Sequence, residues 1–266
     1  MENNKNEKKN LIIVTATICP NSNVFLLEIK DIQIRFQQYM NSLYSLLDTK
    51  YVNYIVFCDN SNYEFDKSSL IKYAHTKGKE IELLSYKSKI DCNQYGKGAG
   101  EAEIMNYILN NSILIQQVDS FYKLTGRVII KNLDRVIKTS MQGNHFIHKR
   151  IYINNYLNEY VETIFYKLNI EQFKKLDDMR FLVNDRNGIY YEHVFFQQMQ
   201  KHGIDYDSFR VYPIKHGISG STGLRYDEPK IDLLKNKFLT SIGLADFYYT
   251  KWQDIKNNIK NRIHIQ

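Results

Sequence analysis

The sequence predicts an α/β fold built on a mainly parallel sheet, with an α+β second half and terminal helices. Short runs rich in β-branched residues recur along the first half, a segment with helical apolar spacing follows each run, and turn-forming residues separate them. Strands that alternate with helices form parallel sheets covered on both faces. Such sheets bind ligands beyond the carboxyl ends of their strands.

The first half supplies three strand and helix pairs. The predicted strands are residues 11–15, 51–58 and 81–86, and the predicted helices are residues 31–47, 68–76 and 100–110. The second strand ends in the turn-forming sequence Asp59-Asn60-Ser61-Asn62. The third helix is opened by glycines and carries apolar residues on one face.

The second half has shorter and more mixed elements. Residues 120–130 lead into predicted strands at 146–153 and 161–166, helices near 170–175 and 190–201, and a strand-like run at 209–214. We divide the chain into a polar leader (1–10), an α/β half (11–130), an α+β half (131–229) and a basic helical extension (230–266). Because no internal repeat and no Gly/Ser linker is visible, two independent domains are not expected.

Composition limits the class of protein. With 43% hydrophobic and 14% aromatic residues over 266 positions, the chain should pack into a core. It contains no apolar stretch of 18 residues and no signal peptide, and its three cysteines suit a reducing compartment, so we expect a cytoplasmic protein. The net charge of +7 favours anionic partners, which include nucleotides, phospholipid headgroups and nucleic acid.

A glycine-rich segment precedes the helix at 100–110. Gly96, Gly98 and Gly100 alternate with Lys97 and Ala99, and Glu101 follows them. Glycines permit close backbone approach, and the free N–H groups of a helix N-terminus favour anions. The segment predicts a site for a diphosphate or its sugar, and the alternative is a flexible turn with a helix cap.

A second candidate segment surrounds residues 119–127. If its strand alternates regularly, Lys123, Thr125 and Arg127 share one face. Lysine and arginine neutralise phosphates by charge-assisted hydrogen bonds, and arginine can make bidentate contacts. The alternative is an exposed basic strand face.

Several motifs occur in a familiar order. They are Thr15-Ala16 at a strand end, Arg35 in a helix, Cys58-Asp59-Asn60-Ser61, Gly-Lys-Gly-Ala-Gly-Glu at 96–101, Asp119, and Lys-Leu-Thr-Gly-Arg at 123–127. Over about residues 10–130 the chain resembles the nucleotide-sugar half of GT-A-type bacterial glycosyltransferases, especially those of capsule and O-antigen clusters. Residues 191–196 and 217–223 are also similar to segments of that group.

The resemblance implies a GT-A-like fold and a transfer reaction. It implies that a nucleoside-diphosphate sugar, with uridine as first choice, donates to a glycan or lipid-linked acceptor. Residues 11–130 would bind the donor and residues 131–229 the acceptor. By position, the resemblance assigns Thr15, Ala16, Arg35 and Asp59 to the base and ribose, and residues 98–101 to the donor sugar.

The resemblance also places a metal ligand at Asp119. In this superfamily an Asp-X-Asp motif holds Mg²⁺ or Mn²⁺, but here Ser120 and Phe121 follow Asp119, so the second carboxylate is missing. Either a distant carboxylate completes the site, or Lys123 and Arg127 stabilise the departing phosphate in place of the metal.

An inverting transfer needs a general base for the acceptor hydroxyl. Glu192 and His193 stand at the start of the predicted helix 190–201, and Glu192 is the first choice. Alternatively, Glu192 stabilises the helix N-terminus and His193 is packed or exposed. The sequence leaves an inverting or retaining course open.

Two C-terminal features suggest further contacts. His216, Ser219 and Ser221 lie in a glycine- and hydroxyl-rich run that predicts a lid over phosphate or sugar, or else an ordinary surface loop. Apolar residues at helical spacing between 244 and 263 alternate with basic ones. That pattern predicts either peripheral contact with the inner face of the cell membrane or packing onto the domain.

Two other functions are compatible with these patterns. A sugar nucleotidyltransferase would share the sheet order, but its glycine-rich signature usually lies on the first strand-helix turn, where this chain has Thr15-Ala-Thr-Ile-Cys-Pro20. A basic nucleic-acid-binding module would use lysines and tyrosines. Because the basic residues are dispersed and the tyrosines lie mostly in apolar runs, no nucleic-acid partner is expected.

Overall fold

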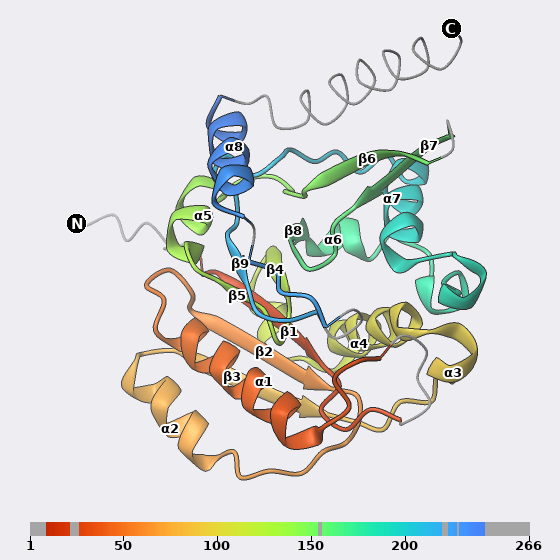
Figure 1. Cartoon of the computed structure of the whole chain (residues 1–266). Coiled ribbons are helices and arrows are strands. Elements are labelled where there is room, and N and C mark those ends of the chain that lie inside the picture. Colours follow the sequence, from red (N-terminus) through yellow and green to blue (C-terminus); the bar gives the residue numbers. More distant parts are fainter. Residues whose placement is uncertain (1–8, 22–26, 154–155, 220–222, 228, 243–266) are drawn as a thin grey trace, which may run out of the picture.

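A five-stranded sheet forms the centre of the molecule (Figure 1). The computed structural model describes residues 9–21, 27–153, 156–219, 223–227 and 229–242. The sheet has the order β3-β2-β1-β4-β8, from β1 (Leu11–Ala16), β2 (Tyr54–Asp59), β3 (Glu80–Ser85), β4 (Ser120–Thr125) and β8 (Phe165–Asn169). The first four strands are parallel to their neighbours and β8 is antiparallel to β4, which confirms the predicted mainly parallel α/β sheet.

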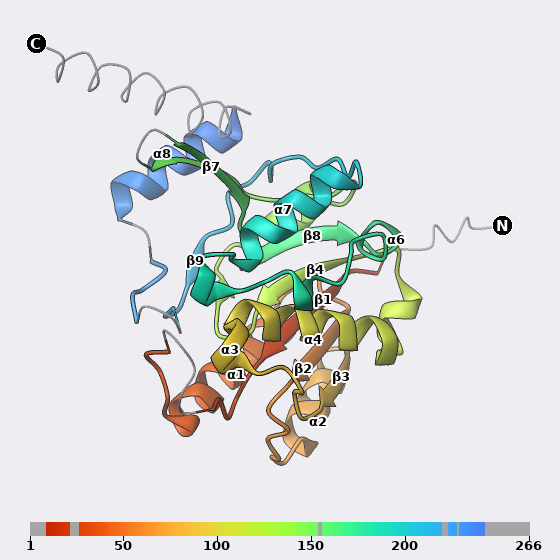
Figure 2. The same ribbon diagram turned by 90° about the vertical axis from the view of Figure 1, so that its right-hand side faces the viewer.

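Helices cover both faces of this sheet (Figure 2). The helices on one face are α1 (Ile32–Leu47), α2 (Ser68–Thr76) and α5 (Leu133–Thr139), and those on the other are α4 (Lys97–Asn111), α6 (Ile170–Phe173) and α7 (Tyr191–Lys201). Alternate strand residues point to opposite faces, so Ile12 and Val14 pack under α1 while Leu11 and Ile13 pack under α4. Each fully buried side chain of this kind contributes about 1.5–3 kcal/mol.

The remaining elements lie around the sheet. They are α3 (Cys92–Tyr95), the short 3-10 helices η1 (Leu114–Gln117), η2 (Met179–Phe181) and η3 (Asp185–Asn187), the paired strands β5 (Ile129–Ile130) and β9 (Lys215–His216), the hairpin β6 (His148–Ile153) and β7 (Tyr156–Val161), and α8 (Lys230–Ser241). In the described residues, no helix has the length and hydrophobicity needed to cross a membrane.

Most predicted elements of the first half are confirmed. The predicted helix 31–47 begins one residue later, because the Asp31 carboxylate accepts a hydrogen bond from the Ile34 N–H and caps the helix. The predicted strand 161–166 is wrong, since Val161 ends β7 and β8 begins at Phe165.

The strand-like run at 209–214 forms no strand. Its backbone bonds to a side chain instead: Asn132 donates to the Tyr212 carbonyl at 2.9 Å and accepts from the Ile214 N–H at 2.8 Å. Pro213 has no backbone N–H and so cannot donate a hydrogen bond to a neighbouring strand. The pairing with β5 therefore starts only at Lys215.

Candidate functional site

A cavity of about 340 Å³ opens at the carboxyl ends of β1, β2 and β4. Residues from every layer line it: Thr15, Ala16 and Thr17 after β1, Arg35 and Tyr39 of α1, Asn60 and Ser61 after β2, Lys97, Gly100 and Glu101 of α4, Thr125 and Arg127 after β4, Thr163, Glu192 of α7 and Tyr226. Eight of the residues predicted from sequence therefore meet in one place. They are Thr15, Ala16, Arg35, Lys97, Gly100, Glu101, Thr125 and Arg127, and Glu192 joins them from the second half.

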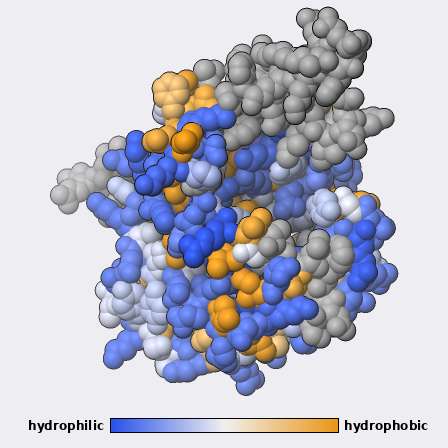
Figure 3. Space-filling model, viewed as in Figure 1, coloured by the Kyte–Doolittle hydropathy of each residue, from blue (hydrophilic) through white to orange (hydrophobic). Residues whose placement is uncertain are grey.

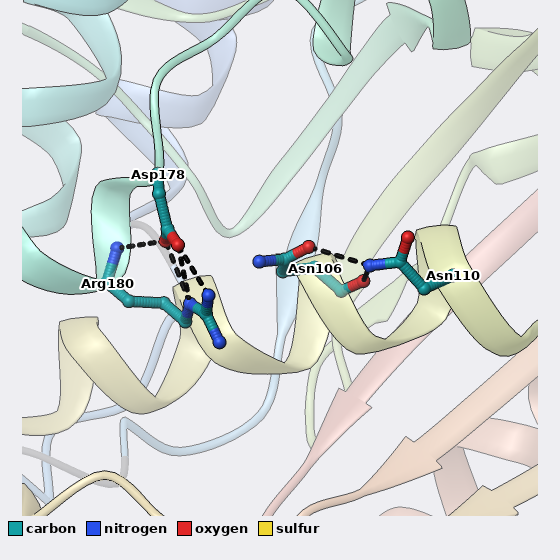
Figure 4. Close-up of polar contacts among 4 residues, drawn as sticks. All are labelled: Asn106, Asn110, Asp178 and Arg180. Atoms are coloured by element: carbon teal, nitrogen blue, oxygen red, sulfur yellow. Dashed lines mark hydrogen bonds and ion pairs between the residues drawn. The ribbon is translucent and has the colours of Figure 1, made fainter.

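Two hollows lie on the outer face of α4, beside Asn106 and Asn110, and have fewer polar groups available to bind a ligand. Figure 4 shows their polar side chains paired with one another. The Asn110 amide donates to the Asn106 carbonyl and side-chain oxygens at 2.8 and 2.9 Å, and the Arg180 guanidinium is held by the Asp178 carboxylate. We therefore assign the functional site to the cavity at the strand ends.

Arg127 lines the cavity with an incomplete set of hydrogen bonds. Its Nη1 donates to the Gln38 amide oxygen at 3.2 Å, but its buried Nε has no hydrogen-bond partner. A buried unsatisfied donor is costly, and an anionic ligand would satisfy it. The backbone brings this residue to the cavity because Gly126 passes so close to the Thr15 carbonyl that a Cβ at position 126 would lie 2.7 Å from it.

Arg35 has a different role from Arg127. Its guanidinium is 3% exposed and donates to the carbonyls of Thr17 at 2.9 Å and Ile29 at 3.0 Å. Burial lowers the pKa of Arg35, and the nearby Arg127 lowers it further. Arg35 thus holds the segment after β1 in place and adds positive potential to the cavity.

Lys97 is the third cation of the cavity. Burial lowers its pKa to about 8, the Asp185 carboxylate opposes this shift, and Arg127 and Arg35 reinforce it. Arg127 and Arg35 therefore lie close enough to Lys97 to disfavour its positive charge. An anion bound between them would relieve the repulsion.

Asp59 lies beneath the cavity rather than in its wall. The carboxylate is 1% exposed and accepts hydrogen bonds from the Ile18 N–H at 2.8 Å and the Tyr63 N–H at 2.9 Å. It therefore ties together the segments that follow β1 and β2, and its oxygens are not directed to a ribose as predicted. The next residue, Asn60, takes the position in the wall and accepts from the Thr17 hydroxyl at 2.7 Å.

The N-terminus of α4 is already occupied by a carboxylate. Asp185 accepts from the Gly98 N–H at 3.1 Å, and a Cβ at Gly96 or Gly98 would collide with it. Gly96 also has φ of 91°, which other residues rarely adopt. Asp185 therefore takes the donors that the sequence assigned to a diphosphate, and Gly96 and Gly98 serve this contact.

Lys123 is buried beneath the cavity. It shares a strand face with Thr125, as predicted, because its Nζ lies 3.0 Å from the Thr125 hydroxyl. The ammonium group is fully buried and is paired with the Glu101 carboxylate and the Thr163 carbonyl. It holds Glu101 in place and is not open to a phosphate, which corrects its assignment to the donor.

Glu192 lies beside this network. The Thr163 hydroxyl donates to its Oε1 at 3.2 Å. Burial raises the pKa of Glu192, and the neighbouring Glu101 raises it further. A half-buried carboxylate with a raised pKa at the wall of a cavity is suited to accept a proton.

His193, one residue on, lies outside the cavity wall. Its ring is flanked by the rings of Tyr160 and Tyr190, with centroids 5.2 and 5.8 Å away. Burial lowers the pKa of His193. Glu192 lines the cavity and His193 does not. Of these two neighbours, only Glu192 is therefore placed to act as a base in the cavity.

Asp119 is at the wrong end of β4 for a metal in the cavity. It directly precedes the strand, whereas the cavity lies at the other end, about 20 Å along a six-residue strand. Its backbone carbonyl accepts from the Ile170 N–H and the Asn169 amide, both at 2.9 Å. Within the described ranges, no group of three or more His, Cys, Asp or Glu side chains could hold a metal ion, so the predicted Mg²⁺ or Mn²⁺ site does not fit at Asp119.

The predicted lid lies partly outside the described residues, because Ser221 is not among them. His216 is in β9, and its Nδ1 lies 2.7 Å from the Asp227 carboxylate rather than in the cavity wall. The Ser219 side chain hydrogen-bonds to Tyr226, which does line the cavity. The segment thus reaches the site through Tyr226, a residue that the sequence pattern did not single out.

Comparisons with known proteins add only distant likenesses. No protein-family model matches the sequence, and comparison with curated proteins found no match. The chain is similar to the solved structure of 4-diphosphocytidyl-2C-methyl-D-erythritol synthase, with 10% identity and a TM-score of 0.42 over 88% of this chain and 100% of that one.

Two solved glycosyltransferase structures are similar to a comparable degree. The glycosyltransferase GlyE of Streptococcus pneumoniae TIGR4 has 11% identity and a TM-score of 0.45, over 76% of this chain and 45% of that one. Core-mannan synthase A of Aspergillus fumigatus, in its Mn/GDP form, has 9% identity and a TM-score of 0.43, over 90% and 86%. Each of these TM-scores is below 0.5.

Proposed function

We propose that this protein is a glycosyltransferase that uses a nucleoside-diphosphate sugar, with uridine as the first-choice base. The acceptor is a glycan or lipid-linked glycan of surface polysaccharide synthesis, as the sequence resemblance implies. One observation carries the proposal: the cavity at the strand ends brings the cations Arg35, Lys97 and Arg127 together with the carboxylates Glu101 and Glu192, and Lys87 and Asp91 also line it.

The cations suit the diphosphate. Arg127 offers an unpaired buried Nε, and Lys97 carries a charge that its cationic neighbours disfavour. A diphosphate between them satisfies both, and each charge-assisted hydrogen bond contributes about 1.5–3 kcal/mol. As the sugar departs, the same fixed charges stabilise the nucleoside diphosphate that is released.

The carboxylates suit the sugar and the acceptor. In an inverting transfer, the acceptor hydroxyl oxygen bonds to the anomeric carbon while the bond from that carbon to the phosphate oxygen breaks. The leaving nucleoside diphosphate keeps the bonding electron pair, and Glu192 takes the hydroxyl proton. Glu101, fixed by Lys123, helps to keep the pKa of Glu192 raised and so makes it a better base.

Thermal unfolding tests the donor site. We expect one nucleoside diphosphate of a panel to stabilise the protein by about 2.7 kcal/mol at 100 times its Kd, with or without Mg²⁺. Arg127→Met should remove most of this shift. Arg135→Met is the matched control, since Arg135 is an exposed arginine of α5 outside the cavity.

Product analysis separates the alternatives. A glycosyltransferase consumes the nucleotide sugar and releases a nucleoside diphosphate, whereas a nucleotidyltransferase takes a nucleoside triphosphate and releases pyrophosphate. Absence of any nucleotide-induced shift, combined with salt-sensitive retention on heparin, would instead favour the nucleic-acid-binding module.

A further inference from the structure

Helix α8 exposes three large apolar side chains, although its Leu239 is buried against the rest of the protein. Ile231, Leu234 and Phe238 are 80%, 66% and 63% exposed, while the polar Asn236 and Thr240 are buried against the rest of the protein. Surface helices normally bury their apolar face. The exposure of these three side chains makes the outer face of α8 apolar, as expected for a face that contacts an apolar environment.

The exposed residues form one continuous stripe. Ile231, Leu234, Phe238 and Ile242 follow at spacings of three, four and four residues, which places them on a single side of a helix with 3.6 residues per turn. Figure 3 shows the hydrophobic patch that α8 contributes to the molecular surface. Contiguous apolar patches of this kind mark contact sites rather than ordinary surface.

Basic residues accompany the stripe. Lys230 and Lys237 are exposed on α8, and Asp232 is its one acidic residue. Within α8 three lysines stand against this one aspartate, a net charge of +2. An apolar stripe with lysines beside it matches an anionic bilayer surface, where side chains enter the acyl boundary and ammonium groups meet lipid phosphates.

We propose that α8 lies on the surface of an anionic membrane, with Leu234 and Phe238 as its central apolar contacts. A second copy of the chain is a poorer occupant, because a two-fold contact through this stripe would bring the lysines of one copy toward those of the other. The predicted membrane helix at 244–263 lies outside the described residues. The proposal rests on α8 alone and is independent of the transfer reaction.

Sedimentation of the full chain with lipid vesicles tests the proposal. We expect binding to phosphatidylcholine vesicles that contain about 30 mol% phosphatidylglycerol, weaker binding to phosphatidylcholine alone, and loss of binding as salt is raised. The double variant Leu234→Gln/Phe238→Gln should bind at least about tenfold more weakly, since it removes two apolar contacts. Lys230→Gln/Lys237→Gln should reduce binding to the anionic vesicles only.

Matched controls make the outcome decisive. Ile113 and Phe181 are 72% and 70% exposed elsewhere on the surface, so Ile113→Gln/Phe181→Gln should bind vesicles like the parent protein. Unchanged melting temperatures confirm that the variants fold. Equal loss of binding in the control, no binding of the parent to anionic vesicles, or a dimer that the α8 variant dissociates in the absence of lipid would each overturn the proposal.

Discussion

If Lys97 binds the diphosphate as proposed, donor binding should depend on pH. Its pKa is lowered to about 8 by burial and by Arg127 and Arg35, and a bound diphosphate would raise the pKa again. The ammonium form binds the anion, so we expect the affinity to fall as pH rises through about 8, and binding above that pH to take up protons.

Calorimetry at pH 8.5 in two buffers of different ionisation enthalpy measures this uptake. Lys97→Met should abolish the uptake, whereas Lys97→Arg should retain tight binding at high pH; identical uptake in Lys97→Met would contradict the assignment.

Glu192 and His193 should differ in their effect on turnover. Glu192→Gln removes the proposed base, so we expect kcat to fall by about 10²–10⁴ with little change in the Kd of the nucleoside diphosphate. His193→Phe, which keeps a ring between Tyr160 and Tyr190, should change kcat far less.

Because burial and Glu101 raise the pKa of Glu192, the parent rate should rise with pH above the usual carboxylate range. Comparable losses in both variants would remove the distinction.

At the scale of one element, the start of α4 depends on Asp185 rather than on a ligand. Asp185→Ala removes a cap from the Gly98 N–H, and we expect it to lower the free energy of unfolding by about 1–2 kcal/mol. Urea unfolding measures this loss. Affinity for the nucleoside diphosphate should change by only a small factor, because the proposed phosphate ligands, Arg127 and Lys97, remain in place. A large gain in phosphate affinity would show instead that the helix N-terminus binds the diphosphate, as predicted from the sequence.

Elements also differ in how clearly the sequence predicts them. The strands β1 and β2 have apolar runs that fit a strand buried on both faces, and the alternation of strands and helices predicts the edge at which the cavity opens. Only Glu162, Thr163 and Ile164 separate the end of β7 from the start of β8, and no glycine or proline marks the break, so the two strands were predicted as one. The cap from Asp185 to Gly98 spans 87 residues and has no local signal. Lys123 and Asp59 have residue types that suit a ligand, and only their burial shows that they bond within the protein.

At the scale of the whole molecule, Glu162 joins distant parts of the C-terminal half. Its carboxylate contacts Lys149 of β6 at 3.2 Å and Lys215 of β9 at 2.5 Å. Burial by itself raises the pKa of Glu162, but the two lysines prevail and lower it to about 2. Because the folded-state pKa is depressed, this contribution to stability is present above the ordinary carboxylate pKa and is lost as pH falls toward 2.

Acid unfolding of a Glu162 variant checks this contribution. We expect Glu162→Gln to reduce the free energy of unfolding by about 2–3 kcal/mol at pH 7, and the difference from the parent protein to shrink toward pH 2. Glu171→Gln is a suitable control, since Glu171 is an exposed partner of Lys174 and should contribute little. A difference that is constant from pH 7 to pH 2 would mean that the carboxylate charge is not the cause.

The close passage of Gly126 past β1 limits how this protein can vary. A Cβ at position 126 would lie 2.7 Å from the Thr15 carbonyl and 2.8 Å from the Tyr39 ring, both of which are part of the cavity wall. Neither the Thr15 carbonyl nor the Tyr39 ring can move away without displacing Arg127 or the segment after β1. In a library randomised at this codon and selected for transfer activity, we therefore expect glycine alone to survive. By contrast, Gly188 and Gly203 have positive φ and open space around the missing side chain, so asparagine should also be recovered there.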